Sequence, residues 1–166
     1  MKKNRLLVLN QEMIRQKIQR MAFEIWEANA LETQVTLVGI QSTGKTLAKL
    51  LKVQLEAIAP FDVDVIGLRL NKRQPLEGKI QLEGELMHRS VVLIDDVANS
   101  GRTLTYALAP LLAYDLDRLL IGVLMDRSHK AFPISPDIVG HSIATTIQER
   151  IEVESEGQML LGSYLI

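Results

Sequence analysis

The feature that most constrains the fold is the run Val91–Ile94, four consecutive apolar residues that lead directly into two carboxylates, Asp95 and Asp96. A strand that is apolar at every position is buried on both faces, as strands are inside a parallel sheet covered by helices. Residues 103–113 then follow as a helix-like segment, with Pro110 as a kink or terminator. The run therefore predicts an interior strand of an α/β domain.

The rest of the chain alternates between strand-like and helix-like segments. Apolar, β-branched runs predict further buried strands at residues 34–40, 63–70, 118–125 and 138–143. Apolar residues at helical spacing predict a helix over 11–29, beginning behind an Asn10 N-cap, and another over 47–58. This alternation predicts an α/β fold, a Rossmann-like and largely parallel sheet flanked by helices. Ligands of such sheets bind beyond the carboxyl ends of the strands, here after Ile40, Asp95 and Met125.

Three remaining segments have weaker patterns. Residues 6–9 predict a short strand, and the apolar run 159–166 predicts a strand at a sheet edge. Residues 71–89 are polar and contain Pro75, Gly78 and Gly84, which indicates a loop or a β-ribbon.

Composition and charge exclude several classes of protein. The chain has 166 residues and no linker or repeat, so we expect residues 1–166 to form one domain. A net charge of -1 provides no general attraction to nucleic acid or to an anionic membrane. The absence of cysteine excludes disulfides and a thiolate nucleophile, and His88, His129 and His141 are too scattered to indicate a metal cluster. No apolar run has the length of a signal peptide or a membrane span, so the expected location is the cytoplasm.

Residues 95–103 join the two carboxylates to a turn that can bind an anion. Adjacent carboxylates at an exposed strand end repel each other unless vicinal hydroxyls or a hydrated Mg²⁺ hold them. Ser100, Gly101 and Thr103 lie where backbone N–H groups at the start of a helix point at a phosphate. Each residue alone would be explained as part of a turn, but the ordered combination indicates a site for a sugar phosphate.

The segment VVLIDDVANSGRTL (91–104) resembles the motif with which type I phosphoribosyltransferases bind 5-phosphoribosyl 1-diphosphate (PRPP). The resemblance implies the fold of that family, including a small C-terminal hood. It implies that Asp95 and Asp96 hold the ribose hydroxyls and bind Mg²⁺ directly or through water. It also implies that the 5-phosphate is bound by Asn99, Ser100, Gly101, Arg102 and Thr103.

Residues 39–46, GIQSTGKT, permit two interpretations. They fit the P-loop pattern G-x-x-x-x-G-K-[ST], in which Lys45 reaches the phosphates of a nucleotide and Thr46 binds Mg²⁺. The family resemblance instead implies a diphosphate loop with a cis peptide near Gln41–Ser42. In that interpretation the diphosphate is bound by Gln41, Ser42, Thr43 and Gly44. We favour the second interpretation because the first leaves the phosphate-like turn after Asp96 unexplained.

The segment DRSHKAFPISPDIVG (126–140) resembles the branch of the family that contains pyrimidine-operon regulators and uracil phosphoribosyltransferases. Ser128, Lys130 and Phe132 replace the Gly, Arg and Leu of that branch. The resemblance covers roughly residues 6–145 and implies a homodimer. It implies that the nucleobase is bound by Asp126, Arg127, Ile138 and Val139, although the last two would equally be core residues.

The expected function is transfer of phosphoribosyl from Mg-PRPP to a nucleobase with release of diphosphate, with Asp95, Asp96 and Arg69 as catalytic residues. Asn99 stands where the 6-oxopurine enzymes have an acid, and because Asn cannot act as a base, uracil is favoured, giving UMP. The loop 71–89 is shorter than in the branch, which indicates slow turnover. Regulators of the branch also bind messenger RNA through the first helix, but acidic residues interrupt its cations here. RNA binding therefore ranks below the enzymatic function.

Overall fold

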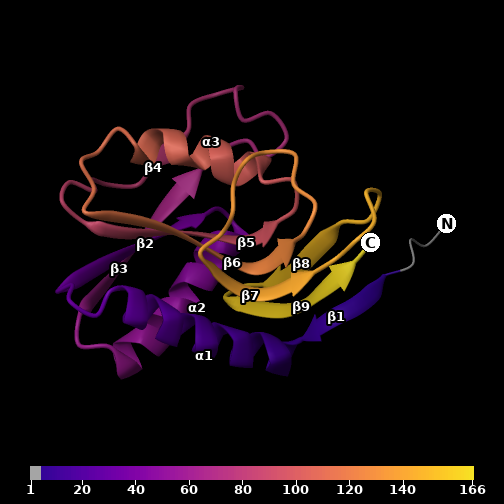
Figure 1. Cartoon of the computed structure of the whole chain (residues 1–166), viewed down its shortest axis with the longest axis horizontal. Coiled ribbons are helices and arrows are strands. Elements are labelled where there is room, and N and C mark those ends of the chain that lie inside the picture. Colours follow the sequence, from indigo (N-terminus) through magenta and orange to yellow (C-terminus); the bar gives the residue numbers. More distant parts are fainter. Residues whose placement is uncertain (1–4) are drawn as a thin grey trace.

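The structure is a computed structural model that describes residues 5–166, and its centre is a six-stranded sheet with helices on both faces (Figure 1). The strand order is β4-β3-β2-β5-β6-β7, and every pairing is parallel except that of β4 with β3. The strands are β2 (Gln34–Ile40), β3 (Asp62–Arg69), β4 (Gln81–Leu82), β5 (Ser90–Ala98), β6 (Arg118–Arg127) and β7 (Ile138–Ile143). The predicted α/β class and the five predicted strands of this sheet are confirmed.

Three helices cover the sheet, and the core lies in two layers beneath them. The helices are α1 (Gln11–Ala28), α2 (Thr43–Ile58) and α3 (Arg102–Leu111). Helices α1 and α2 lie together on one face, and α3 lies alone on the other (Figure 1). The predicted N-cap is confirmed, because Asn10 Oδ1 accepts a hydrogen bond of 2.9 Å from Met13 N. None of the described helices combines the length and apolarity needed to cross a membrane.

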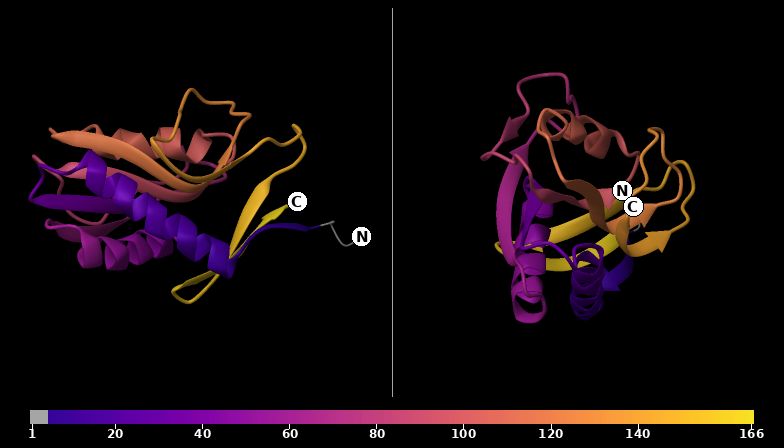
Figure 2. Two further views of the ribbon diagram at one scale, coloured as in Figure 1. Left: turned by 60° about the horizontal axis from the view of Figure 1, so that its bottom comes forward. Right: turned by 60° about the vertical axis from the view of Figure 1, so that its left-hand side comes forward.

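A second, three-stranded antiparallel sheet forms a hood at one end of the molecule (Figure 2). Its order is β1-β9-β8, with β1 (Leu6–Asn10), β9 (Met159–Leu165) and β8 (Ile151–Glu156). The prediction that 159–166 lies at a sheet edge is wrong, because β9 pairs with β1 on one side and with β8 on the other. The hood therefore joins residues from the two ends of the described chain.

Two element boundaries differ from the predictions in ways that affect the site. Strand β5 continues to Ala98 because β6 runs beside it, with Asp95 opposite Val123. Asp95 therefore lies inside a sheet strand and is only 1% exposed, so the expectation of carboxylates at an exposed strand end is wrong for this residue. Helix α2 begins at Thr43 rather than at residue 47, so its first turn is part of the GIQSTGKT segment.

Candidate active site

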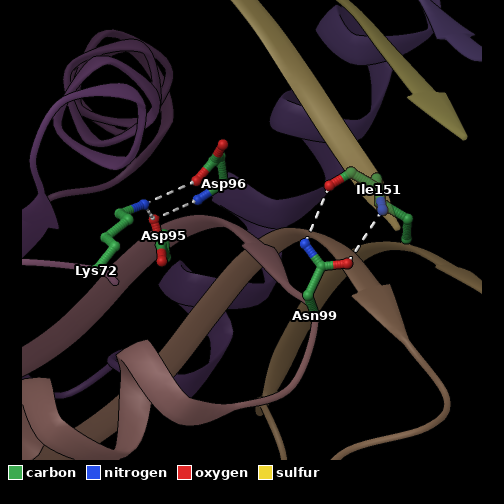
Figure 3. A network of polar contacts seen from close by, with 5 residues as sticks. All are labelled: Lys72, Asp95, Asp96, Asn99 and Ile151. Atoms are coloured by element: carbon green, nitrogen blue, oxygen red, sulfur yellow. Dashed lines mark hydrogen bonds and ion pairs between the residues drawn. The ribbon is translucent and has the colours of Figure 1, made fainter. Parts of the chain in front are cut away.

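A cavity of about 180 Å³ opens beside the C-terminal half of β5. It is lined by Lys72 from the segment after β3, by residues 95–104, and by residues 151–153 of the hood strand β8. The carboxylate pair and the predicted 5-phosphate turn therefore face one space. Figure 3 shows Lys72 directed at the two carboxylates and Asn99 directed at the hood.

The two carboxylates share one ammonium group. Lys72 Nζ lies 2.9 Å from Asp95 Oδ1 and 3.4 Å from Asp96 Oδ1 (Figure 3). Burial, together with the neighbouring charge of Asp96, raises the pKa of Asp95 well above its usual value, and Lys72 only partly offsets this. Burial by itself would lower the pKa of Lys72, but Asp95 and Asp96 outweigh it and raise that pKa. The cavity therefore contains a carboxylate pair that strongly favours a bound cation.

The turn between β5 and α3 has a backbone that only glycine accommodates well. Gly101 has φ 79°, and a Cβ built on it would lie 2.6 Å from Ile134 Cγ2. The carbonyl of Ser100 accepts hydrogen bonds from Ala131 N at 3.0 Å and Phe132 N at 3.1 Å, which holds the turn against the segment after β6. Because α3 begins at Arg102, the N-terminus of the helix faces the cavity. This geometry suits an anion, and the predicted residues Ser100, Gly101, Arg102 and Thr103 all line the cavity.

Asn99, one of the predicted 5-phosphate residues, lines the cavity, and its side chain is bonded to the hood. Its Nδ2 donates to the Ile151 carbonyl and its Oδ1 accepts from Ile151 N, each at 3.0 Å (Figure 3). Residues 151–153 were not recognised from the sequence, because no motif marks β8 and its contact with the turn is made through Asn99, 52 residues earlier. Asn99 thus connects the predicted phosphate turn to a wall of the cavity that sequence reasoning missed.

The predicted diphosphate loop lies beside a second cavity of about 370 Å³. Its lining consists of Gln41, Ser42, Lys45, Thr46, Lys49, Arg69 and Glu83. The Gln41–Ser42 peptide is cis, as predicted. Gly44 contacts β5 so closely that an added Cβ would lie 2.7 Å from the Ile94 carbonyl and 3.0 Å from Asp95 Cα. The loop that carries Gln41 to Gly44 is therefore packed directly against the carboxylate-bearing strand.

Arg69 belongs to this second cavity rather than to the first. Its Nε donates to Gln41 Oε1 at 3.1 Å. Lys45, the P-loop lysine of the alternative interpretation, makes an ion pair of 2.7 Å with Glu83 Oε2. Both cations therefore lie beside the loop 41–44, where they would face an anionic leaving group. The catalytic role of Arg69 stays a prediction.

The predicted base-binding residues are not gathered in the main cavity. The buried Arg127 donates to Thr145 Oγ1 at 2.6 Å and to the carbonyls of Thr146 and Ile147, so it anchors the segment before β8. Asp126 Oδ1 lies 2.6 Å from Lys130 Nζ, as an ion pair without hydrogen-bond geometry.

The two apolar members of this set have different surroundings. Ile138 is 3% exposed and belongs to the core beneath α1 and α2. The carbonyl of Val139 accepts a hydrogen bond of 2.8 Å from Arg20 on α1. The interpretation of Ile138 as a core residue, left open by the sequence, agrees with this packing.

The carboxylate pair has the chemistry of a Mg²⁺ site. Carboxylate oxygens are the ligands that Mg²⁺ prefers, and the Lys72 ammonium is a stand-in cation at the same position. Among residues 5–166, no group of three or more His, Cys, Asp or Glu could hold a metal ion. Asp95 and Asp96 could thus supply only part of a coordination shell. This suits Mg²⁺, which commonly keeps waters and takes phosphate oxygens from a substrate.

The largely parallel sheet carries a carboxylate pair, a helix N-terminus that faces the same cavity, and a nearby loop with cations beside it. This arrangement is typical of proteins that bind a phosphorylated sugar. The phosphoribosyl transferase domain family matches residues 8–156, and the chain belongs to this family. The recognised family is therefore confirmed, and the chain is a phosphoribosyltransferase.

Relatives and solved structures agree with this assignment. The chain is 32% identical over 162 residues to "Bifunctional protein PyrR" of Bacillus cereus strain AH820, covering 89% of each protein. It is 28% identical over 160 residues to the protein of that name from Haemophilus ducreyi, covering 90% of this chain and 89% of that one. A hypoxanthine-guanine phosphoribosyltransferase from Bacillus anthracis has the same fold with a TM-score of 0.73 at 14% identity, covering 96% of this chain and 99% of that one. A Staphylococcus aureus hypoxanthine phosphoribosyltransferase has a TM-score of 0.74 at 17% identity, covering 88% and 80%.

Proposed function

We propose that this protein transfers phosphoribosyl from Mg-PRPP to uracil, giving UMP and diphosphate. The observation that carries the proposal is the arrangement of three subsites along one strand. The turn 99–103, the carboxylates of β5 and the loop 41–44 follow one another in space, because the turn and the carboxylates line one cavity and Gly44 packs against Asp95. A 5-phosphate, a ribose and a 1-diphosphate would lie in the same order. The similarity to PyrR proteins over most of the chain supports the pyrimidine branch.

The residues of the site would act mainly by positioning and by charge. Asp95 and Asp96 accept hydrogen bonds from the ribose hydroxyls, and the N–H groups at the start of α3 hold the 5-phosphate. When the C1–O bond breaks, negative charge moves onto the diphosphate, where Arg69 and Lys45 are close enough to stabilise it. Mg²⁺, held at Asp95 and Asp96, would neutralise further charge on the diphosphate. Fixing donor and acceptor in one orientation then supplies much of the rate enhancement.

The surroundings of Asn99 support a nucleobase substrate that does not require a proton acceptor from the turn 99–103. Asn is neutral, and both of its polar atoms are already bonded to Ile151. The side chain can therefore neither accept a proton nor turn toward a base without releasing the hood. Uracil remains the proposed substrate, although the solved structures of similar fold are hypoxanthine enzymes.

The proposal is tested by measuring diphosphate release from Mg-PRPP with uracil, hypoxanthine or guanine as acceptor. Release with uracil is expected. The Asp95→Asn, Asp96→Asn double variant should bind PRPP at least about two orders of magnitude more weakly, since each charge-assisted hydrogen bond contributes about 1.5–3 kcal/mol. Glu85→Gln, at an exposed position outside both cavities, is the matched control. Release with purines alone would contradict the choice of uracil, and unchanged PRPP affinity in the folded double variant would contradict the proposed site.

Binding of RNA is the second candidate, and the outer face of α1 gives it less support. Arg15 makes an ion pair of 3.1 Å with Glu12, and Arg20 is paired with Glu24. Cations that already have carboxylate partners neutralise phosphates less effectively. We expect no sequence-specific complex at physiological salt in a filter-binding assay with a pyrimidine-operon leader. A tight complex that UMP strengthens would instead make the pocket a nucleotide sensor.

A further inference from the structure

The segment 70–84 places one charged side chain in each of the two cavities. Lys72, near its start, enters the cavity of the carboxylate pair, and Glu83, near its end, enters the cavity beside the loop 41–44. The sign of each charge is opposite to that of the groups around it. The segment therefore has the charge pattern of a ligand for both cavities.

Glu83 has three donors around one carboxylate. Its Oε2 accepts from Lys45 Nζ at 2.7 Å and from Gly67 N at 3.0 Å, and its Oε1 accepts from Gln41 Nε2 at 2.8 Å. The hydrogen bond from Lys45, ahead of the others, lowers the pKa of Glu83 below its usual value. Strand β3 leaves room for the carboxylate, because a Cβ on Gly67 would lie 2.6 Å from Glu83 Oε2. An anion is thus bound at the place assigned to the diphosphate.

Lys72 makes the complementary contact in the other cavity. Its ammonium lies within 3.4 Å of both Asp95 and Asp96, where the ribose hydroxyls and a metal ion are expected. The Lys72 side chain is still 39% exposed, so it can leave toward solvent without crossing packed core. The cation site is therefore filled by a group that is able to withdraw.

We infer that the segment 70–84 is an autoinhibitory device that mimics the substrate, with Lys72 in place of the metal and ribose and Glu83 in place of the diphosphate. That the excluded ligand is PRPP rests on the proposed function. Both contacts must be released for PRPP to bind.

At its end the segment is held to the main sheet by β4, which pairs with β3 through Leu68–Leu82 and Arg69–Gln81, and by Glu83 N, which donates to the Gly67 carbonyl at 3.0 Å. Leu70, Ile80 and Leu82 also pack against the core beneath α3. Release therefore detaches the two-residue edge strand β4 but leaves the five parallel strands paired.

The first test measures the affinity for inorganic diphosphate by calorimetry in wild type, Glu83→Gln and the control Glu85→Gln. Glutamine keeps the size of Glu83 but removes the charge that competes with diphosphate. While the Glu83 carboxylate occupies the site, diphosphate can bind only to the fraction of molecules in which Glu83 has left it, and the apparent affinity is reduced by that fraction. Glu83→Gln should therefore bind diphosphate about three- to tenfold more tightly. Glu85→Gln should bind as wild type does. Equal or weaker binding by Glu83→Gln would overturn the inference.

The second test uses trypsin, which must take up a free Lys or Arg side chain. Cleavage after Lys72, distinguished by mass spectrometry from cleavage after the exposed Arg73, reports on release of Lys72. Magnesium diphosphate should accelerate this cleavage if the segment is displaced, whereas ordinary ligand protection would slow it. Slower or unchanged cleavage would overturn the inference while leaving the proposed function in place. Absence of diphosphate binding in folded wild type and in folded Glu83→Gln would contradict the proposed function, and the inference would fall with it.

Discussion

Replacement of Asn99 by alanine tests whether the hood is held to the active site by one side chain. The substitution removes the two 3.0 Å hydrogen bonds to Ile151. A hydrogen bond contributes about 0.5–1.5 kcal/mol net, and a part-buried N–H left without a partner adds to the loss. We therefore expect the free energy of unfolding to fall by about 2 kcal/mol, which lowers Tm by about 4–8 °C in a domain of this size.

Scanning calorimetry measures the change, and hydrogen exchange locates it. Exchange should accelerate in β8 and β9 more than in β5, because the hood loses its connection while the main sheet stays intact. Asn71→Ala is the matched control, since the Asn71 side chain also takes part in two hydrogen bonds, both accepted at 3.1 Å by its Oδ1, but within an exposed loop. A Tm within about 1 °C of wild type for Asn99→Ala would refute the reasoning.

Three further predictions concern the glycine, carboxylate and lysine of the site. Gly101→Ala should lower Tm and weaken PRPP binding, because the left-handed φ costs about 1–2 kcal/mol for a non-glycine residue and the new Cβ would clash with Ile134. Asp95→Asn should weaken PRPP binding by about one to two orders of magnitude, the loss of one charge-assisted hydrogen bond, but raise Tm, and the gain in Tm should be larger at pH 8 than at pH 5. The raised pKa means that the folded protein binds the Asp95 proton more tightly than the unfolded chain, so wild-type stability falls as pH rises through that pKa. A Tm difference independent of pH would contradict this cause. Lys45→Ala should keep PRPP affinity within about tenfold, because Lys45 would contribute one partly exposed ion pair to a diphosphate that Arg69 and the loop 41–44 would also hold. An ATPase activity that the wild type has and this variant loses would restore the P-loop interpretation.

The main sheet could be predicted because its signals are local. The strands at 34–40 and 138–143 have the bounds that the sequence predicted, and Asn10 marks the start of α1 within a single turn. The residues proposed for the sugar phosphate could also be singled out, since 95–103 form one uninterrupted segment, and the structure places them along one cavity. Local sequence thus contained the elements of the sheet and the main part of the candidate site.

The missed features all depend on partners that are distant in sequence. Asn99 looks like a member of a phosphate turn, and only the placement of Ile151, 52 residues later, shows that it holds the hood. Arg127 resembles a ligand-binding cation, but its Nε and Nη2 donate to residues 145–147 and anchor that segment. Glu83 lies in a polar stretch without a motif, and only its hydrogen bonds from Gly67 N and Lys45 Nζ place it in the second cavity. Contacts between a side chain and a remote backbone leave no periodic pattern to detect.

The pairing of β1 with β9 has a consequence for the order in which a ribosome-bound chain can acquire activity. Leu9 N donates to Ser163 Oγ across a separation of 154 residues. Strand β1 is therefore synthesised early but has no partner until β9 has been translated, whereas the strands of the main sheet meet neighbours much sooner. Contacts of such long separation form late in folding. The wall of the cavity formed by β8 should accordingly be completed last, so a nascent chain would contain the carboxylates and the phosphate turn before it could enclose a substrate.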